Sequence, residues 1–326
     1  MTDATYLVFE TGGTKLVAGV AGRDCRILET RILYREHDDR AGTSLKRLAA
    51  AAHELTEKHQ QQGAAFRAVG FGFGGVVRRS TRDPYLCLHE DGWEELSVVE
   101  TLEREFRLPV FVENDCKLAA LAEAHFGAGR GHRTVFYVTL GTGVGGGIVR
   151  DGRIQTFSDV GEAESGHVVV APDGPACPCG NRGCVEAVCS GPGVSRLAAW
   201  VAEQDGGLWS QSSLCKGHGR AEDISSKKIM EAWALGDPFA TNVADRAAGY
   251  LAQALGAVVH LISPDVVVVG GGLGSGNPRF LSLVSEKLRP QVVSYFRDQY
   301  QIVPCELGEQ VVSQGAAILA SQAVGE

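Results

Sequence analysis

The segment YLVFETGGTKLVAGV, Tyr6–Val20, places two apolar stretches on either side of a glycine turn. The stretches Tyr6–Phe9 and Leu16–Val20 predict two short strands, because apolar runs of this length bounded by turn residues are typical of strands. A third run at Ile27–Leu33 predicts another strand after a second turn. We therefore expect an antiparallel meander at the beginning of the fold.

Helices and strands alternate after this meander. Apolar residues recur at helical spacing in Ser44–Gln62, and a second helix is expected around Leu96–Phe106. Strands are expected at Ala68–Phe73 and Val110–Glu113. The resulting order, βββαβαβ, predicts an α/β fold.

The second half of the chain repeats this order. A helix is expected from Asn114 to about Phe126, followed by strands at Val135–Leu140, Gly147–Val149 and Val266–Val269. The repetition indicates an internal duplication that builds two lobes with a nucleotide and sugar cleft between them. Ser and Gly residues predict a surface excursion at Gly206–Arg220.

Length and composition suit two lobes that bind small molecules. The chain has 326 residues, 44% of them hydrophobic, which is enough for a core in each lobe. We expect one lobe at residues 1–113, completed by a helix at 313–326, and the other at 114–312.

A net charge of -8 gives no basic surface for nucleic acid or an anionic membrane. No signal peptide is visible, and nine cysteines, three of them crowded together, suit a reducing compartment, so we expect a cytoplasmic protein.

Three glycine-rich loops are candidates for binding a nucleotide. Glycine lets the main chain come close to phosphate oxygens and point its N–H groups at them. A plain hairpin turn is the alternative for any one loop, but three loops together favour a nucleotide. The candidate residues are Gly12, Gly13, Thr14 and Lys15 in the first loop, Gly141, Thr142 and Gly143 in the second, and Gly270, Gly271 and Gly272 in the third, which suits adenosine.

Glu113-Asn114-Asp115 follows an apolar strand and precedes a helix. Ligands bind at such strand ends in α/β sheets. A carboxylate here can take the proton from a sugar hydroxyl that attacks the γ-phosphate of ATP, with Mg²⁺ neutralising the phosphate charge. The alternative is that Asn114 or Asp115 only caps the helix. Both interpretations can hold for adjacent residues.

One histidine and three cysteines have the spacing of a zinc site. His167, Cys177, Cys179 and Cys184 offer one imidazole and three thiolates, and tight turns separate them. Four protein ligands leave no open position, so we expect a structural Zn²⁺; unrelated buried cysteines are the alternative. Glu164 and Glu186 flank these ligands in the sequence and can accept hydrogen bonds from sugar hydroxyls, although either glutamate alone is more typical of a surface position. By contrast, the acidic residues Glu90, Asp91, Glu94 and Glu95 around Trp93 indicate a solvated face with one buried aromatic side chain.

Taken together, these motifs resemble those of the ROK family (repressor, open reading frame, kinase), nearly from end to end. The segment from Glu164 to Glu186, with CPCGNRGCVE at its end, resembles the zinc and sugar motif of that family. The resemblance implies a two-lobed α/β fold of the hexokinase/actin-like (ribonuclease H-like) ATPase class. It also implies transfer of the γ-phosphate of ATP to a hexose or amino sugar, usually at O6, by a protein that is a homodimer.

The resemblance further implies a role for each motif residue. Asp115 would be the catalytic base, and Glu10 would hold Mg²⁺ through water. The sugar would contact Gly74, Gly75, Asn114, Asp115, Glu164, His167 and Glu186.

Some positions depart from the common pattern. Glu10 stands where most members have Asp, Val76 and Arg78 stand where Pro and Asp are common, and Ser165 replaces a more frequent apolar residue. The Glu10 departure bears on the water-mediated hold on Mg²⁺, and the Val76 and Arg78 departures bear on the identity of the sugar. The sugar stays open among glucose, N-acetylhexosamines, mannose, fructose, allose and 3-amino-3-deoxyglucose. A sugar-binding regulator without catalysis remains an alternative. The family also includes repressors, which carry a DNA-binding domain ahead of the kinase-like part. The first phosphate loop begins ten residues from Met1, so we expect no DNA-binding domain ahead of it.

Overall fold

The computed structural model describes residues 4–36, 39–87, 90–218 and 220–325. The chain forms two compact units. The first comprises Met1–Gly131, Gly147–Glu162 and Glu306–Glu326, and the second comprises His132–Gly146 and Ala163–Cys305. The boundary expected after residue 113 therefore falls inside the first unit, because the helix that starts at Asp115 packs against the C-terminal helix.

The first unit is built on a five-stranded sheet with the order β3-β2-β1-β4-β7. Its strands are β1 (Ala4–Thr11), β2 (Lys15–Ala21), β3 (Ile27–Tyr34), β4 (Ala65–Phe73) and β7 (Val110–Asn114). The first three strands pair antiparallel, whereas β1–β4 and β4–β7 pair parallel. This arrangement confirms the predicted meander followed by βαβ connections.

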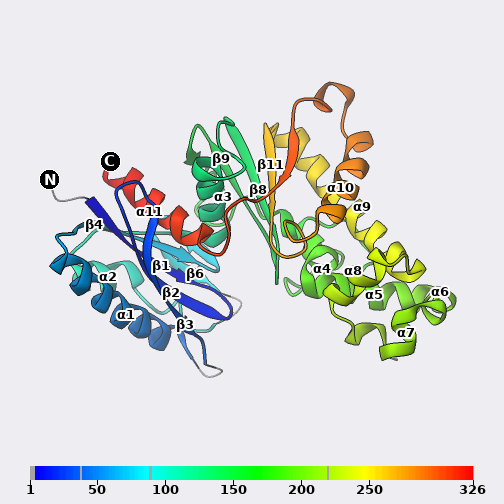
Figure 1. Ribbon diagram of the computed structural model, residues 1–326, viewed down its shortest axis with the longest axis horizontal. Helices are drawn as coiled ribbons and strands as arrows, with labels where there is room; N and C mark the ends of the chain where they lie inside the picture. The colour runs from blue at the N-terminus through cyan, green and yellow to red at the C-terminus, as the bar shows by residue number, and fades with distance from the viewer. Residues whose placement is uncertain (1–3, 37–38, 88–89, 219, 326) are drawn as a thin grey trace. The chain divides into compact units, whose positions relative to one another are not determined.

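Helices cover both faces of this sheet (Figure 1). They are α1 (Ala41–Gln61), α2 (Val98–Phe106), α3 (Asp115–Phe126) and α11 (Val311–Val324). The alternation along β4 explains the two faces, since successive side chains of a strand point to opposite sides. Phe71 and Phe73 belong to the core that α1 and α2 complete. Gly70 lies against α11, where an added Cβ would come within 2.0 Å of the Ala316 carbonyl oxygen.

A second five-stranded sheet repeats the plan of the first. It has the order β10-β9-β8-β11-β12 and is formed by β8 (Thr134–Leu140), β9 (Val144–Arg150), β10 (Arg153–Ile154), β11 (Val266–Gly270) and β12 (Gln301–Pro304). As in the first sheet, the outer hairpin pairs antiparallel, and β8–β11 and β11–β12 pair parallel. Two sheets of one order support the internal duplication expected from the sequence. A small hairpin of β5 (Val76–Arg78) and β6 (Asp83–Leu86) is added to the first unit.

Helices make up most of the rest of the second unit. They include α4 (Val185–Cys189), α5 (Gly191–Gln204), α8 (Ser226–Ala234), α9 (Pro238–Ile262) and α10 (Pro278–Leu288). Among the residues described, we find no helix that combines the length and the apolar character needed to span a membrane.

The excursion predicted at Gly206–Arg220 does lie largely at the surface, and it is helical. It contains α6 (Gly206–Gln211) and α7 (Ser213–His218). Asp237 fixes the junction of these helices, because its carboxylate accepts hydrogen bonds from the hydroxyls of Ser212 and Ser213. Tertiary hydrogen bonds therefore order a segment whose composition predicted only its place at the surface.

The predicted solvated face around Trp93 is wrong for one residue. Glu90 is buried, and its carboxylate accepts hydrogen bonds from Ser44 Oγ at 2.6 Å and from Trp93 Nε1 at 2.8 Å. The Arg35 guanidinium lies 3.4 Å from the same carboxylate and compensates its charge. The neighbours Asp91, Glu94 and Glu95 are exposed, and Trp93 is buried, as expected.

Candidate functional site

In the first unit, the loop between β1 and β2 is a tight turn with exposed glycine and threonine at its tip. The Gly12 N–H donates to the Lys15 carbonyl oxygen at 3.0 Å, while Gly13 and Thr14 are exposed. A hairpin turn is therefore present, and its tip remains accessible to a ligand.

Glu10 lies at the base of this loop. It is 7% exposed, and Ser313 Oγ donates to its carboxylate at 3.0 Å. Burial raises the pKa of Glu10, although the nearby Lys15 ammonium, 4.0 Å away, opposes the shift. The negative charge of Asp115 also raises this pKa, because two carboxylates repel each other.

Asn114 and Asp115 lie where β7 ends and α3 begins. The Asn114 side chain caps the helix, accepting hydrogen bonds from the N–H groups of Cys116 and Lys117 at 3.0 and 3.2 Å. Its amide nitrogen donates to the Gly75 carbonyl oxygen at 3.0 Å and to Asp115 Oδ1 at 3.1 Å. The capping alternative is thus correct for Asn114, but the same side chain also orients the Asp115 carboxylate.

The neighbouring loop completes this group of residues in the first unit. The Gly74 N–H lies 3.4 Å from Thr11 Oγ1, so the Gly74–Gly75 loop and the first phosphate loop are in contact. The structure therefore brings together five predicted site residues, Glu10, Gly74, Gly75, Asn114 and Asp115, with the first phosphate loop beside them.

The second unit contains a cavity of about 910 Å³ at the second and third glycine loops. Gly141, Thr142 and Gly272 line it, as do apolar residues that include Met230 and Trp233. A volume of this order matches the pockets that hold nucleotide-sized ligands, about 300–1,000 Å³. The apolar residues that line the cavity are of the kind that can contact the face of an adenine ring.

Gly270 and Gly271 shape this cavity without lining it. Gly271 has φ +80°, and an added Cβ would come within 2.4 Å of the Leu140 carbonyl oxygen. Only glycine fits there. An added Cβ at Gly272 would meet no atom within 4 Å, so this position leaves space for a ligand.

Sequence reasoning did not find the outer wall of the cavity. The Arg279 guanidinium stacks over the Trp233 ring, 4.1 Å from its centroid, and donates to the Trp233 carbonyl oxygen at 3.1 Å. Both residues line the cavity although they are 46 positions apart in the chain. Gly191 and Pro192 also line the cavity, and the Gly191 N–H donates to the Gly141 carbonyl oxygen at 2.8 Å. This Gly-Pro pair at the start of α5 is a local sequence signal for that part of the wall.

Glu186 connects the cysteine loop to the second phosphate loop. It lies in the first turn of α4, two residues after Cys184, and its Oε2 accepts a hydrogen bond from the Val144 N–H at 3.0 Å. Gly143 leaves room for this carboxylate, since an added Cβ would lie 2.7 Å from Oε2. The structure thus places Glu186 beside the phosphate loop that the sequence treated as a separate motif.

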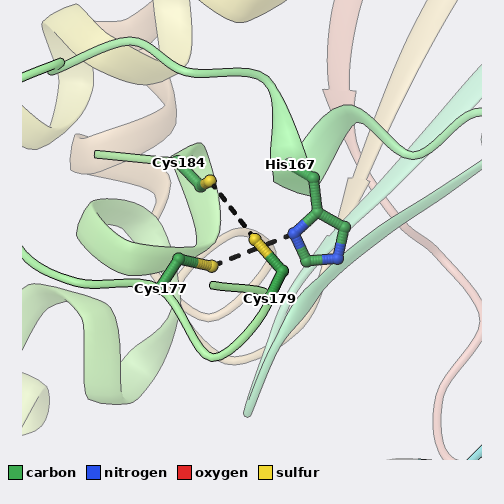
Figure 2. Close-up of side chains that lie close together, drawn as sticks. All are labelled: His167, Cys177, Cys179 and Cys184. Carbon is green, nitrogen blue, oxygen red and sulfur yellow. Dashed lines mark hydrogen bonds between the residues drawn. The ribbon is translucent and has the colours of Figure 1, made fainter. Parts of the chain in front are cut away.

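His167, Cys177, Cys179 and Cys184 form one cluster in the second unit (Figure 2). Their four ligand atoms lie within 4.8 Å of one another. Cys177 Sγ is 3.9 Å from His167 Nδ1, and Cys179 Sγ is 3.7 Å from Cys184 Sγ. Tetrahedral zinc with Zn–S bonds of about 2.3 Å separates two sulfurs by roughly 3.8 Å, so the cluster fits zinc. Burial raises the pKa of Cys184 to about 12, and a metal therefore has to displace that proton.

Glu164 precedes the short turn Ser165–His167. It is exposed, and its carbonyl oxygen accepts the His167 N–H at 3.1 Å. His167 turns Nδ1 toward Cys177, which leaves Nε2 on the other side of the ring (Figure 2). Ser165 Oγ is buried and has no hydrogen-bond partner among the described residues, and nothing in the structure explains this departure from the family pattern.

Two sheets of the same order, glycine turns and a strand-end carboxylate define a two-unit protein of the hexokinase/actin-like ATPase class. The chain belongs to the ROK family, whose sequence model matches residues 6–323. It is 32% identical over 317 residues to the glucokinase of Thermotoga maritima, with 97% of each chain covered.

Two solved structures share the fold over almost the whole chain. The ROK hexokinase of Thermus thermophilus is 28% identical with a TM-score of 0.83, and the comparison covers 98% of this chain and 99% of that one. The ROK glucokinase of Streptomyces griseus, solved in complex with glucose and AMPPNP, is 32% identical with a TM-score of 0.75 and the same coverage.

Proposed function

We propose that this chain is an ATP-dependent kinase that phosphorylates a hexose or amino sugar, at O6 of the sugar. The observation that carries the proposal is the Asp115 carboxylate at the end of β7, oriented by Asn114 at 3.1 Å. A carboxylate held at a strand end next to a glycine phosphate loop suits proton abstraction from an attacking hydroxyl. The similarity to glucokinases over the full chain supports the same activity.

Asp115 acts as the general base in this proposal. As the sugar O6 forms its bond to the γ-phosphorus of ATP, the bond from that phosphorus to the β-γ bridging oxygen breaks, and the hydroxyl proton passes to Asp115. Magnesium supplies neutralisation of the phosphate charge when bound. Glu10 would hold it through water, and Lys15 stands at the same loop.

The nucleotide and sugar contacts follow the resemblance residue by residue. Adenosine would occupy the cavity that Gly272 lines. The phosphates would contact Gly12, Gly13, Thr14, Gly141, Thr142 and Gly143. In this proposal the sugar would contact Gly74, Gly75, Asn114, Asp115, Glu164, His167 and Glu186. The geometry of the cysteine cluster supports a structural Zn²⁺ that holds His167 and the start of α4 in place.

An ADP-release screen over the candidate sugars tests the activity. Purified protein is incubated with Mg²⁺, ATP and each of glucose, N-acetylhexosamines, mannose, fructose, allose and 3-amino-3-deoxyglucose, and the position of phosphate is read by NMR. We expect sugar-dependent ADP release that Asp115→Asn abolishes nearly completely. Sugar binding without turnover for every candidate would instead favour a non-catalytic regulator.

The homodimer expected from the resemblance stays a prediction. Sedimentation equilibrium at micromolar concentration tests it. A mass of twice 34.6 kDa is the expected result.

A further inference from the structure

A cluster of four charged side chains lies behind the strand end that carries Asp115. Its members are Arg79, Glu113, Lys117 and Glu162, all in the first unit. The side chains of Glu113, Lys117 and Glu162 are 9%, 6% and 6% exposed, whereas that of Arg79 is 35% exposed.

Each cation of the cluster contacts both anions. Lys117 Nζ lies 3.0 Å from Glu162 Oε1 and 3.5 Å from Glu113 Oε1. Arg79 lies 3.5 Å from Glu113 Oε2 and also pairs with Glu162. Glu162 Oε2 is buried with no hydrogen-bond partner among the described residues, so Glu162 depends on the two cations for compensation of its charge. Loss of either cation would leave an uncompensated carboxylate in the interior.

Glu113 connects the cluster to the residues that orient the base. Its Oε1 accepts the Asn114 N–H at 2.9 Å. Asn114 in turn donates to Asp115 Oδ1, and Lys117 lies in the first turn of α3, two residues after Asp115. The four charges thus fix both the strand end and the helix start between which Asp115 is held.

We call Ser158–Glu162 the crossover segment, because the chain leaves the first unit after Glu162. Arg79 connects the cluster to this segment. The Arg79 N–H donates to the Asp159 carbonyl oxygen at 2.8 Å, and its Nε donates to the Ser158 carbonyl oxygen at 3.2 Å. Ser80 adds two hydrogen bonds to the Asp159 carboxylate, at 2.7 and 3.0 Å. The loop after β5 therefore holds the crossover segment along its length.

The crossover segment is followed by Ala163 and then by Glu164, which the proposed function assigns to the sugar. Ala163 has φ +60°, a left-handed conformation that is uncommon for residues other than glycine. Such a conformation persists only where the surroundings determine it. The ion pairs of Glu162 with Arg79 and Lys117 hold the backbone one residue before Ala163 and so restrict the Ala163 conformation.

We propose that Arg79, Lys117 and Glu162 are positioning residues of the phosphoryl-transfer site, which with Glu113 hold the Asn114–Asp115 strand end and the crossover segment that leads to Glu164. This inference rests on the proposed function, because the groups that it positions are the base and a sugar ligand. None of the three acts on the reacting atoms. Their effect passes through Asn114, Asp115 and Glu164.

Kinetics of Arg79→Met, Lys117→Met and the conservative Arg79→Lys test the inference. Arg82→Met is the matched control, because Arg82 lies in the same turn and its exposed side chain pairs with Glu103 at 3.7 Å, outside the cluster. We expect Arg79→Met and Lys117→Met to lower kcat/KM for the sugar by about tenfold or more, the scale of a misplaced reacting group, with KM for ATP unchanged. Arg79→Lys should recover part of the loss, and Arg82→Met should match the wild type.

Hydrogen exchange supplies a readout that does not depend on turnover. In Lys117→Met and Glu162→Gln, the amides of Arg79, Ser80 and Asn114 should exchange faster, while those around Gly272 keep the wild-type rate. Variants that lose thermal stability but keep sugar kinetics and these exchange rates would overturn the inference and leave a structural role. If the wild type phosphorylates no sugar, the proposed function fails, and the exchange experiment still decides whether the cluster holds these segments.

Discussion

The Val144 N–H donates to Glu186 Oε2 at 3.0 Å, and this contact joins the helix after the cysteine loop to the loop expected to bind phosphate. Val144 is 3% exposed, so its N–H has little access to water. Glu186 is at the same time a residue that the family resemblance assigns to the sugar. One carboxylate therefore serves the second phosphate loop and the proposed sugar site.

Two substitutions at Glu186 separate its charge from its hydrogen bond. Glu186→Ala leaves the Val144 N–H unsatisfied, which costs about 1–3 kcal/mol of unfolding free energy, and should raise KM for both sugar and ATP. Glu186→Gln keeps an acceptor oxygen and should lose sugar affinity with little loss of stability. Thermal denaturation and steady-state kinetics measure both effects. Equal stability of the two variants would contradict a structural role for the contact.

Asp115→Asn tests the general base. Because Asn114 provides the helix cap, the substitution should leave the fold and sugar affinity nearly intact while lowering kcat by about 10²- to 10⁴-fold. Sugar binding by calorimetry and single-turnover phosphorylation measure the two properties separately. Retention of more than about a tenth of the activity would remove Asp115 from this role.

Much of the fold was predictable, because long apolar runs bounded by glycine turns fix the central strands. The edge strands of the second sheet, β10 and β12, were not. β10 has two residues and β12 has four, with a largely exposed pattern in β12, so neither carries a periodic apolar signal. Pairing with a buried neighbour, β9 or β11, makes them strands. Such segments take their conformation from tertiary context rather than from local sequence.

The zinc ligands can be tested by metal content and stability. Cys177→Ser and Cys179→Ser each remove one of four ligands, so the protein should retain well under one zinc per chain and unfold at a lower temperature. Cys215→Ser is the control, since Cys215 lies outside the cluster and should leave zinc and stability unchanged. Metal analysis by mass spectrometry decides the outcome. A wild-type protein without zinc would remove the metal from the proposal.

The candidate site was predictable where its residues are adjacent in sequence. Asn114 and Asp115 form one motif, and the cysteine loop forms another. The sequence did not indicate that Glu90 is buried, because its partners Ser44 and Arg35 lie far away in the chain. For the same reason it gave no sign of the Arg79 and Glu162 pair, which are 83 positions apart. Charged residues are mostly exposed, so a buried one is found only when the fold supplies its partner.

Glu10→Gln tests the buried carboxylate at the first phosphate loop. Burial raises the pKa of Glu10 above its ordinary value of 4.5, so the folded state binds a proton that the unfolded state has already released. Stability therefore falls as pH rises from about 4.5 toward the folded pKa of Glu10, since the folded state then binds more protons than the unfolded state. The glutamine amide does not titrate in this pH range, so the variant should lose the part of the pH dependence of stability that Glu10 contributes.

Denaturant unfolding of the wild type and Glu10→Gln between pH 4.5 and 8 measures this difference. The variant should gain stability relative to the wild type as pH rises and then keep a constant advantage. It should nevertheless lose most of its kcat, and Mg²⁺ with a non-hydrolysable ATP analogue should stabilise it less than the wild type, because the carboxylate that would hold the metal is gone. Glu54→Gln, an exposed change on α1, is the control and should follow the wild-type profile. Parallel stability profiles for the wild type and Glu10→Gln would show that burial does not disfavour the Glu10 charge, and would leave its role at the phosphate loop to kinetics alone.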